Sequence, residues 1–176
     1  MILRSATIVG KEGENLVVDG RDGPDYPLHP GYVIPLVPAK RIRPNQPVIA
    51  EWAQTLRHGI ARRYLKDKVV VRFTDTPDKS DRTLDLSQVM PATDGFHPGN
   101  YAALRQGSEL EHVLLVSPVK GEAKDAPEWL VIGYAGAARV VRTDALLGVP
   151  ISYEPKVGTV ALVEHLGKMR EGIIKE

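Results

Sequence analysis

The sequence predicts an all-β protein made of small repeated modules, with few or no long helices. Short apolar segments rich in Val and Ile alternate with turn residues along the 176 residues. The 16 Gly and 14 Pro residues show no period, so the chain must turn often. With 43% hydrophobic and 26% charged residues, the composition is that of a folded globular protein rather than of a disordered chain.

Ten segments carry the strand pattern, each bounded by Gly, Pro, Asn or Asp. In chain order they are residues 6–9, 16–18, 32–37, 48–52, 59–65, 69–73, 112–116, 129–134, 139–141 and 160–163. Helical patterning is confined to residues 88–90, 101–104 and 162–170, where we expect at most a turn or so of helix because no capped amphipathic stretch is present.

Short phrases recur and indicate modules. Residues 28–36 and 96–104 share the letters His-Pro-Gly, and the pattern Leu-x4-Val-[Ile/Met]-Pro occurs at 28–35 and 84–91, with 141–150 loosely alike. We therefore divide the chain into an N-terminal partial module (1–37), two full modules (38–92 and 93–152) and C-terminal strands (153–176). Modules of roughly 55 residues with short strands suit small SH3-like barrels packed together, because closure removes sheet edges and packing enlarges the buried core.

The second module carries a recognisable order of phrases. It reads Val48-Ile-Ala-Glu-Trp52, then Arg57-His-Gly-Ile-Ala61, then Lys68-Val-Val-Val-Arg-Phe73-Thr-Asp75, then Leu84-Asp-Leu-Ser-Gln-Val89. Over residues 47–91 this resembles a Tudor or Agenet-type domain, in which one strand carries V-x-A-x-W and a later one V-x-V-x-F-x-D. The resemblance implies an SH3-like barrel.

The resemblance also implies a candidate aromatic mouth. In the eukaryotic family an aromatic cage at one end of the barrel binds methylated Lys or Arg, and by position Trp52, Tyr64 and Phe73 are the candidates here. The family often follows F-x-D with an aromatic residue and Gly, whereas this chain has Thr76 and Pro77. The alternative is that the three aromatic side chains fill the interior of the barrel.

The net charge of +1 hides a basic stretch. Residues 38–72 hold nine basic and two acidic side chains, hence +7, whereas residues 1–37 hold three and five and residues 73–176 hold eleven and fifteen. Strand alternation predicts that Arg62, Tyr64 and Lys66 share one face. We expect a band that binds nucleic acid or another anion without reading sequence, unless these charges only solvate the strand or pair with acidic modules; its members are Arg57, Arg62, Lys66, Lys68 and Arg72.

The usual sequence marks of enzymes and metal sites are missing. The chain has no Cys, no phosphate-binding glycine motif and no nucleophile elbow, and its five His residues have no ligand spacing. Asp residues at 19, 22 and 25 and at 75, 78, 81 and 85 suit tight turns better than a calcium loop. We expect no metal and no cofactor, and, because no signal peptide or membrane span is recognisable, a cytoplasmic protein that does not associate with membranes.

These observations predict a non-enzymatic binding protein of tandem Tudor-like barrels that contacts the backbone of DNA or RNA, or a nucleic-acid-associated protein, through residues 38–72. The alternative is a structural or assembly module that binds an acidic protein partner, and an enzyme is the third hypothesis. Residues 158–174 repeat the opening of the second module, whereas residues 1–37 lack a first strand. We therefore expect residues 157–176 to complete the N-terminal segment, within one chain or in a homo-oligomer joined through terminal strands.

Overall fold

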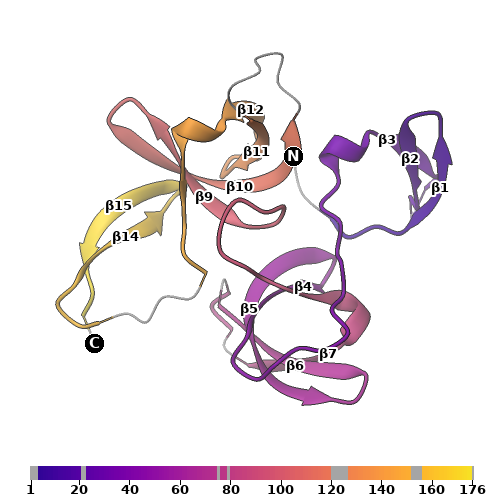
Figure 1. The fold of residues 1–176 in the computed structure, drawn as a ribbon, viewed down its shortest axis with the longest axis horizontal. Coiled ribbons are helices and arrows are strands. Elements are labelled where there is room, and N and C mark those ends of the chain that lie inside the picture. The colour runs from indigo at the N-terminus through magenta and orange to yellow at the C-terminus, as the bar shows by residue number, and fades with distance from the viewer. Residues whose placement is uncertain are drawn as a thin grey trace. The chain divides into compact units, whose positions relative to one another are not determined.

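The computed structural model describes residues 4–20, 23–74, 76–78, 80–119, 127–151 and 156–175. Within these residues helix is confined to three 3-10 turns of three residues each, which confirms the all-β prediction. The strands form three sheets (Figure 1). The chain divides between Thr93 and Asp94 into two compact units, each with a hydrophobic core of its own.

The first unit begins with a three-stranded antiparallel sheet in the order β1–β2–β3. Its strands are β1 (Ile8–Glu12), β2 (Asn15–Val18) and β3 (Tyr26–Leu28), and the 3-10 turn η1 (Pro30–Tyr32) follows. The side chain of His29 caps η1, its Nδ1 accepting a hydrogen bond from the Gly31 N–H at 3.1 Å. The segment 33–39 contains no strand, so the predicted strand at 32–37 is wrong.

The same unit continues with a five-stranded antiparallel sheet in the order β7–β6–β5–β4–β8. Its elements are β4 (Pro47–Trp52), β5 (Thr55–Leu65), β6 (Lys68–Phe73), β7 (Asp81–Asp85), η2 (Leu86–Gln88) and β8 (Val89–Pro91). Alternation along β6 directs Val69, Val71 and Phe73 into the core, where they meet Ile42 from the loop before β4.

The second unit repeats this arrangement strand for strand, in the order β12–β11–β10–β9–β13. Its elements are β9 (Tyr101–Gln106), β10 (Glu109–Val119), β11 (Glu128–Gly133), β12 (Ala138–Arg142), η3 (Thr143–Ala145) and β13 (Leu146–Gly148). A hairpin of β14 (Val160–His165) and β15 (Lys168–Ile173) extends this sheet, because β15 pairs with the beginning of β10. Residues 101–104 and 162–170, predicted as helical turns, are therefore strand and hairpin.

The long second strand of each five-stranded sheet is shared between two neighbours. β5 pairs first with β4 and then with β6, and β10 pairs first with β9 and then with β11. Both β5 and β10 contain a β-bulge, which bends the strand and increases its twist. The extra residue is Arg62 in β5 and Val116 in β10, and β1 has the same irregularity at Val9.

Both five-stranded sheets are open in the described residues, which differs from the closed barrels that we expected. β7 and β8 are the two ends of one sheet, and β12 and β13 are the corresponding ends of the other. The reason is local: a 3-10 turn after β7 or β12 leads the last strand across to the first strand, so it pairs there and not with its predecessor.

The recurring phrases differ in their structural meaning. Residues 28–35 and 84–91 both contain the end of a strand, a 3-10 turn and the segment after it, so this repeat is structural. In contrast, the His-Pro-Gly phrase caps and begins η1 in one place, whereas in the other it lies in the turn before the first strand β9. Its two occurrences are therefore not equivalent.

Candidate nucleic-acid interface

The loop before β4 lies against the bulge of β5. The Asn45 N–H donates to the Ala61 carbonyl at 2.7 Å, and the Ala61 N–H donates to the Gln46 carbonyl at 2.9 Å. Within the loop, the Arg43 N–H donates to Gln46 Oε1 at 2.9 Å. Asn45 has a φ of 62°, a left-handed conformation that Asn adopts more readily than most residues. These bonds fix the course of the loop beside the strand.

One buried side chain orients two arginines in this loop. Ile42 is only 1% exposed and belongs to the core cluster, whereas Arg41 and Arg43 on either side of it are exposed. Neighbours of a buried residue in extended backbone point away from the core. A hollow with a volume of about 590 Å³ is lined by Arg41, Arg43 and residues 44–46.

The bulge places two further arginines in solvent. Arg62 and Arg63 are both exposed, whereas Tyr64 packs against the core cluster. Lys66 is exposed in the turn after β5, with a φ of 49°. The predicted alternation of Arg62, Tyr64 and Lys66 on one face is therefore wrong, because the extra residue of the bulge shifts the pattern.

We call the five cations of the loop, the bulge and the adjoining turn the basic surface: Arg41, Arg43, Arg62, Arg63 and Lys66. None of them forms an ion pair with another described residue. Their charges are thus available to an external anion. Sequence reasoning counted Arg41, Arg43 and Arg63 in the basic stretch but not in the site. The signal that marks two of them is a single apolar residue between two arginines.

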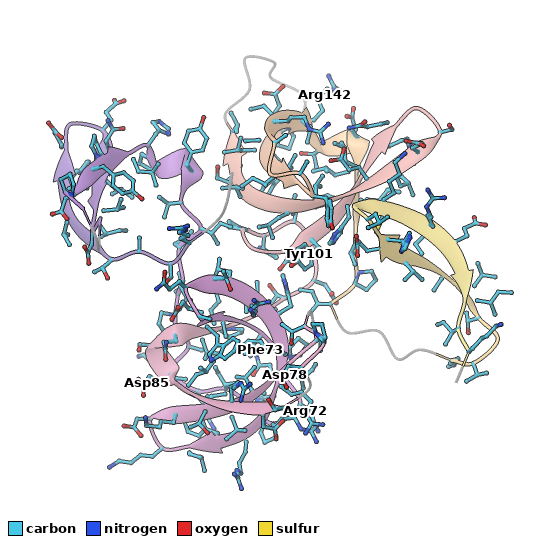
Figure 2. All side chains as sticks on the ribbon, turned by 180° about the vertical axis from the view of Figure 1, so that it is seen from behind. Arg72, Phe73, Asp78, Asp85, Tyr101 and Arg142 are labelled. Atoms are coloured by element: carbon cyan, nitrogen blue, oxygen red, sulfur yellow. The ribbon has the colours of Figure 1, made fainter. Side chains whose placement is uncertain are left out.

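Two other residues of the predicted band, Lys68 and Arg72, form ion pairs within the sheet. Lys68 Nζ lies 3.0 Å from Asp85, and Arg72 Nε lies 2.8 Å from Asp81, in both cases across the β6–β7 pair. Figure 2 labels Arg72 and Asp85 among the side chains of this unit. The hydrogen bond to Asp85 raises the pKa of Lys68. Arg57 is half-buried in β5. The structure therefore moves the centre of positive charge from the strands to the loop and the bulge.

The three candidate cage aromatics contact one core cluster. Phe73 is only 3% exposed and lies inside the curved sheet (Figure 2), with its ring centroid 5.8 Å from that of Trp52. Trp52 and Tyr64 are partly buried against the same cluster. The guanidinium of Arg82 lies 5.0 Å above the Trp52 ring, where a methylated ligand cation would stack.

Arg82 is itself held by Asp78 through an ion pair. Hydrogen bonds from Ser80 contribute most to lowering the pKa of Asp78, so this carboxylate stays charged. Sequence reasoning missed Arg82, which stands opposite Val71 in the β6–β7 register. The register could not be derived without knowing the length of the loop between the two strands.

No group of three or more His, Asp or Glu side chains that could hold a metal ion occurs in the described part of the chain. Of the Asp residues considered for calcium, Asp22 and Asp75 lie outside it. Among these same residues, no helix has the length and apolar character needed to cross a bilayer.

The sequence matches no protein-family model, and no curated protein matches it significantly.

Proposed function

We propose that the protein is a non-enzymatic binding protein whose basic surface contacts the phosphate backbone of DNA or RNA. The observation that carries this proposal is the junction of loop and bulge, where two backbone hydrogen bonds join the segments that carry five cations without ion-pair partners among the described residues. Contacts to phosphates supply affinity without reading base sequence. Binding is therefore expected to depend on salt and hardly on sequence.

We also propose that residues 47–91 form a Tudor-like module. The order β7–β6–β5–β4–β8, the bent second strand and the 3-10 turn before the last strand support this assignment. The arginine above Trp52 argues for nucleic acid rather than methylated Lys as the ligand, because the ring face is already occupied by a cation. The cytoplasm remains the expected compartment.

The test is fluorescence anisotropy with a labelled DNA duplex and a labelled single-stranded RNA at low salt. Wild type is compared with R41Q/R43Q/R62Q/R63Q. The matched control, R105Q/R142Q/K156Q/K175Q, removes the same charge from the second unit. We expect the first variant to lose binding and the control to retain it. The slope of log K against log salt falls by about 0.9 for each duplex contact removed.

Three results decide against the proposal or in favour of its alternative. Absence of binding by the wild-type protein at low salt contradicts it. Equal weakening by both variants shows that net charge, not this surface, attracts the polyanion. Binding of poly-L-glutamate without binding of either nucleic acid favours the acidic protein partner as the ligand of the same surface.

A further inference from the structure

The C-terminal hairpin is a third copy of a hairpin that occurs twice in complete modules. β4–β5, β9–β10 and β14–β15 each contain six residue pairs around a two-residue turn. In the first two, the outer edge of the first strand is covered: β8 pairs with β4, and β13 pairs with β9. No described strand pairs with the corresponding edge of β14. That edge lacks a short antiparallel strand.

The N-terminal sheet has the complementary deficiency. The N-terminal sheet has the same register as the later part of the complete module. β1 corresponds to the second half of β5, including the bulge, and β2, β3 and η1 correspond to β6, β7 and η2. In the complete module, the three residues after η2 form β8 on the edge of β4. The equivalent residues are Val33, Ile34 and Pro35, which belong to no strand in the described chain. This segment lacks the edge of a first strand.

Exposed apolar side chains mark the same two places. Of the fifteen large hydrophobic residues exposed in the described chain, eleven lie within residues 8–37 and 157–173. Val163 on β14 is 51% exposed, whereas Ala50, its equivalent on β4, is 0% exposed. Clustered apolar exposure of this kind marks an interaction surface.

A shared backbone contact shows how one module follows another. The Ser5 N–H donates to the carbonyl of Gln54 in the β4–β5 turn at 2.9 Å. The His112 N–H donates to the carbonyl of Gly167 in the β14–β15 turn at 2.8 Å. Ser5 and His112 are equivalent by register, as are Gln54 and Gly167. In both cases an earlier module donates to the hairpin that comes next in the chain.

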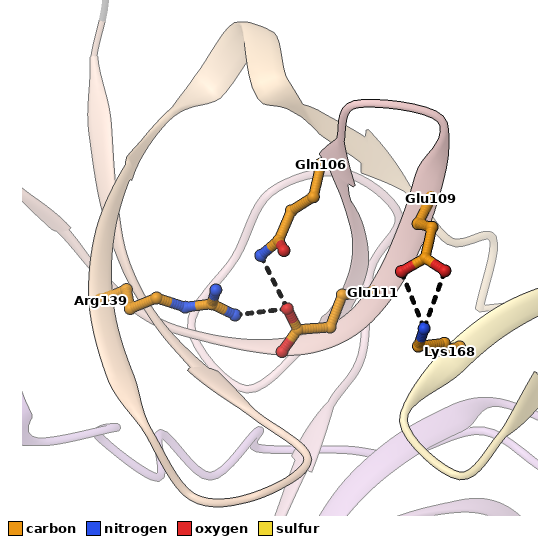
Figure 3. A network of polar contacts seen from close by, with 5 residues as sticks. All are labelled: Gln106, Glu109, Glu111, Arg139 and Lys168. Atoms are coloured by element: carbon orange, nitrogen blue, oxygen red, sulfur yellow. Dashed lines mark hydrogen bonds and ion pairs between the residues drawn. The ribbon is translucent and has the colours of Figure 1, made fainter.

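Side chains anchor the C-terminal hairpin to its own unit. Lys168 Nζ, at the start of β15, donates to both carboxylate oxygens of Glu109 at 2.8 Å (Figure 3). Beside this pair, and within the five-stranded sheet itself, Glu111 of β10 accepts from Arg139 at 2.5 Å and from Gln106 at 2.8 Å. The ion pair with Lys168 lowers the pKa of Glu109. The tip of the hairpin is therefore fixed to β10, while the outer edge of β14 stays uncovered in the described residues.

We propose that this edge binds a second copy of the chain, head to tail. The hairpin of one copy supplies the first strand, residues 8–35 of the next copy supply the rest, and together they complete a five-stranded module. We choose a second copy as the partner because of the two backbone contacts described above. In each of them an earlier module donates to the hairpin that follows it, and the same kind of contact can join the end of one copy to the beginning of the next. Such a heterologous contact produces rings or linear arrays.

The complete module fixes the register of this contact. The pairs Ala50↔Val89, Ile49↔Met90 and Val48↔Pro91 translate into Val163↔Val33, Leu162↔Ile34 and Ala161↔Pro35. In the joined module Glu171 of the first copy takes the place of Ser5 of the second, and its N–H donates to Gln54 instead. Residues 4–7 of the incoming copy are displaced.

The free edge of β14 is chemically ready for pairing. Ile174 donates to the Thr159 carbonyl, so Thr159 and alternate residues after it bond to β15. Leu162 falls between them, and its N–H and carbonyl point to the outer edge. In the register given above, Leu162 is therefore the residue that bonds to Ile34 of the partner strand.

The test uses the absence of native Cys. Ile34→Cys and Leu162→Cys proteins are prepared separately in reduced form. Each protein is oxidised alone, and a mixture of the two is oxidised in parallel. A disulfide-linked pair is expected in the mixture and in neither protein alone. His165→Cys mixed with Ile34→Cys is the register control and is expected to give no pair. In analytical ultracentrifugation, wild type is expected to associate with rising concentration, whereas Leu162→Pro, which removes the outward N–H but no bond to β15, stays monomeric.

Two outcomes overturn the proposal. One is a wild-type protein that remains monomeric at rising concentration, together with the absence of a linked pair in the mixture of Ile34→Cys and Leu162→Cys. The other is an intrachain disulfide in monomeric Ile34→Cys/Leu162→Cys, which assigns the edge to the N-terminal segment of the same chain. Circular dichroism of Leu162→Pro checks that the strands are retained, so a loss of association reports the edge and not unfolding.

Discussion

The guanidinium carbon of Arg82 lies 5.0 Å from the ring centroid of Trp52, so an internal cation covers the aromatic residue that the sequence marks most clearly as a ligand contact. Arg82 reaches this position from β7 and is held there by Asp78 of the preceding loop. The pair shields one side of the indole from water.

Arg82→Ala is expected to uncover Trp52. A cation over an indole contributes about 0.5–1 kcal/mol at an exposed site, so the loss in stability is small. Acrylamide quenching of Trp fluorescence should rise, and the signal reports Trp52 because Trp129 is only 7% exposed. Arg82→Lys keeps a cation and serves as the control. Unchanged quenching in Arg82→Ala contradicts a covering role for this side chain.

Ile42→Ala is expected to weaken both the fold and the binding of nucleic acid. Removing a buried Ile side chain costs about 2–5 kcal/mol. It also releases the loop that presents Arg41 and Arg43, so affinity for DNA should fall even at temperatures where the protein stays folded. Leu84→Ala, in the same core cluster but far from the loop in sequence, is the matched control for lost stability. Equal DNA affinity of the two variants would show that the loop needs no anchor.

Gly59→Ala is expected to destabilise the first unit by about 1–3 kcal/mol. An added Cβ would lie 2.7 Å from the Arg72 carbonyl oxygen and 2.8 Å from Val71 Cγ1, which forces the β5–β6 pair apart. Gly172 occupies the equivalent place in β15, where a Cβ meets only Val163 Cγ2 at 3.4 Å. Urea unfolding of Gly59→Ala and Gly172→Ala tests the contrast, and equal midpoints for the two variants would refute it.

The second unit is expected to lose stability as pH falls. Burial lowers the pKa of His112 below its ordinary value of 6.5, and the carboxylate of Glu164 partly opposes this shift. The unfolded chain therefore binds the proton more readily, and stability decreases as pH drops through the unfolded value. His112→Gln should flatten the dependence, whereas His165→Gln, on exposed β14, should not. Unfolding at several pH values is followed by Trp129 fluorescence in a Trp52→Phe background.

Much of the fold follows from residue patterns alone. The short apolar runs of β6 and β11, rich in Val and Ile, locate two central strands, because both faces of such a strand are buried. The Leu-x4-Val-[Ile/Met]-Pro phrase locates the 3-10 turn that separates the last two strands. The helical turn expected at residues 101–104 is wrong because a short run with two Ala residues has no decisive period, and only its pairing with β10 makes it a strand.

The candidate site was harder to predict. A bulge leaves no mark in the letters of the sequence, yet it decides that Arg62 and Arg63 are both exposed. Ion pairs between strands depend on which residues stand opposite each other. The sequence alone therefore does not show that Asp81 neutralises Arg72, and Arg72 is counted with the free positive charges of the stretch. The sequence repeat at residues 158–174 correctly indicates that the C-terminal hairpin resembles β4–β5. It does not indicate that the hairpin pairs with β10.

The hydrogen bonds by which Ser5 and His112 reach the turn of the following hairpin join backbone atoms, and at Ser5 the hydroxyl adds one side-chain bond, to Glu51 Oε1 at 3.2 Å. Any amino acid except proline supplies the same N–H, and any residue supplies the same carbonyl. Neighbouring modules can therefore exchange nearly all their side chains while the joint between them survives. The equivalence of the modules is therefore easier to recognise in their backbone hydrogen bonds than in their amino-acid sequences.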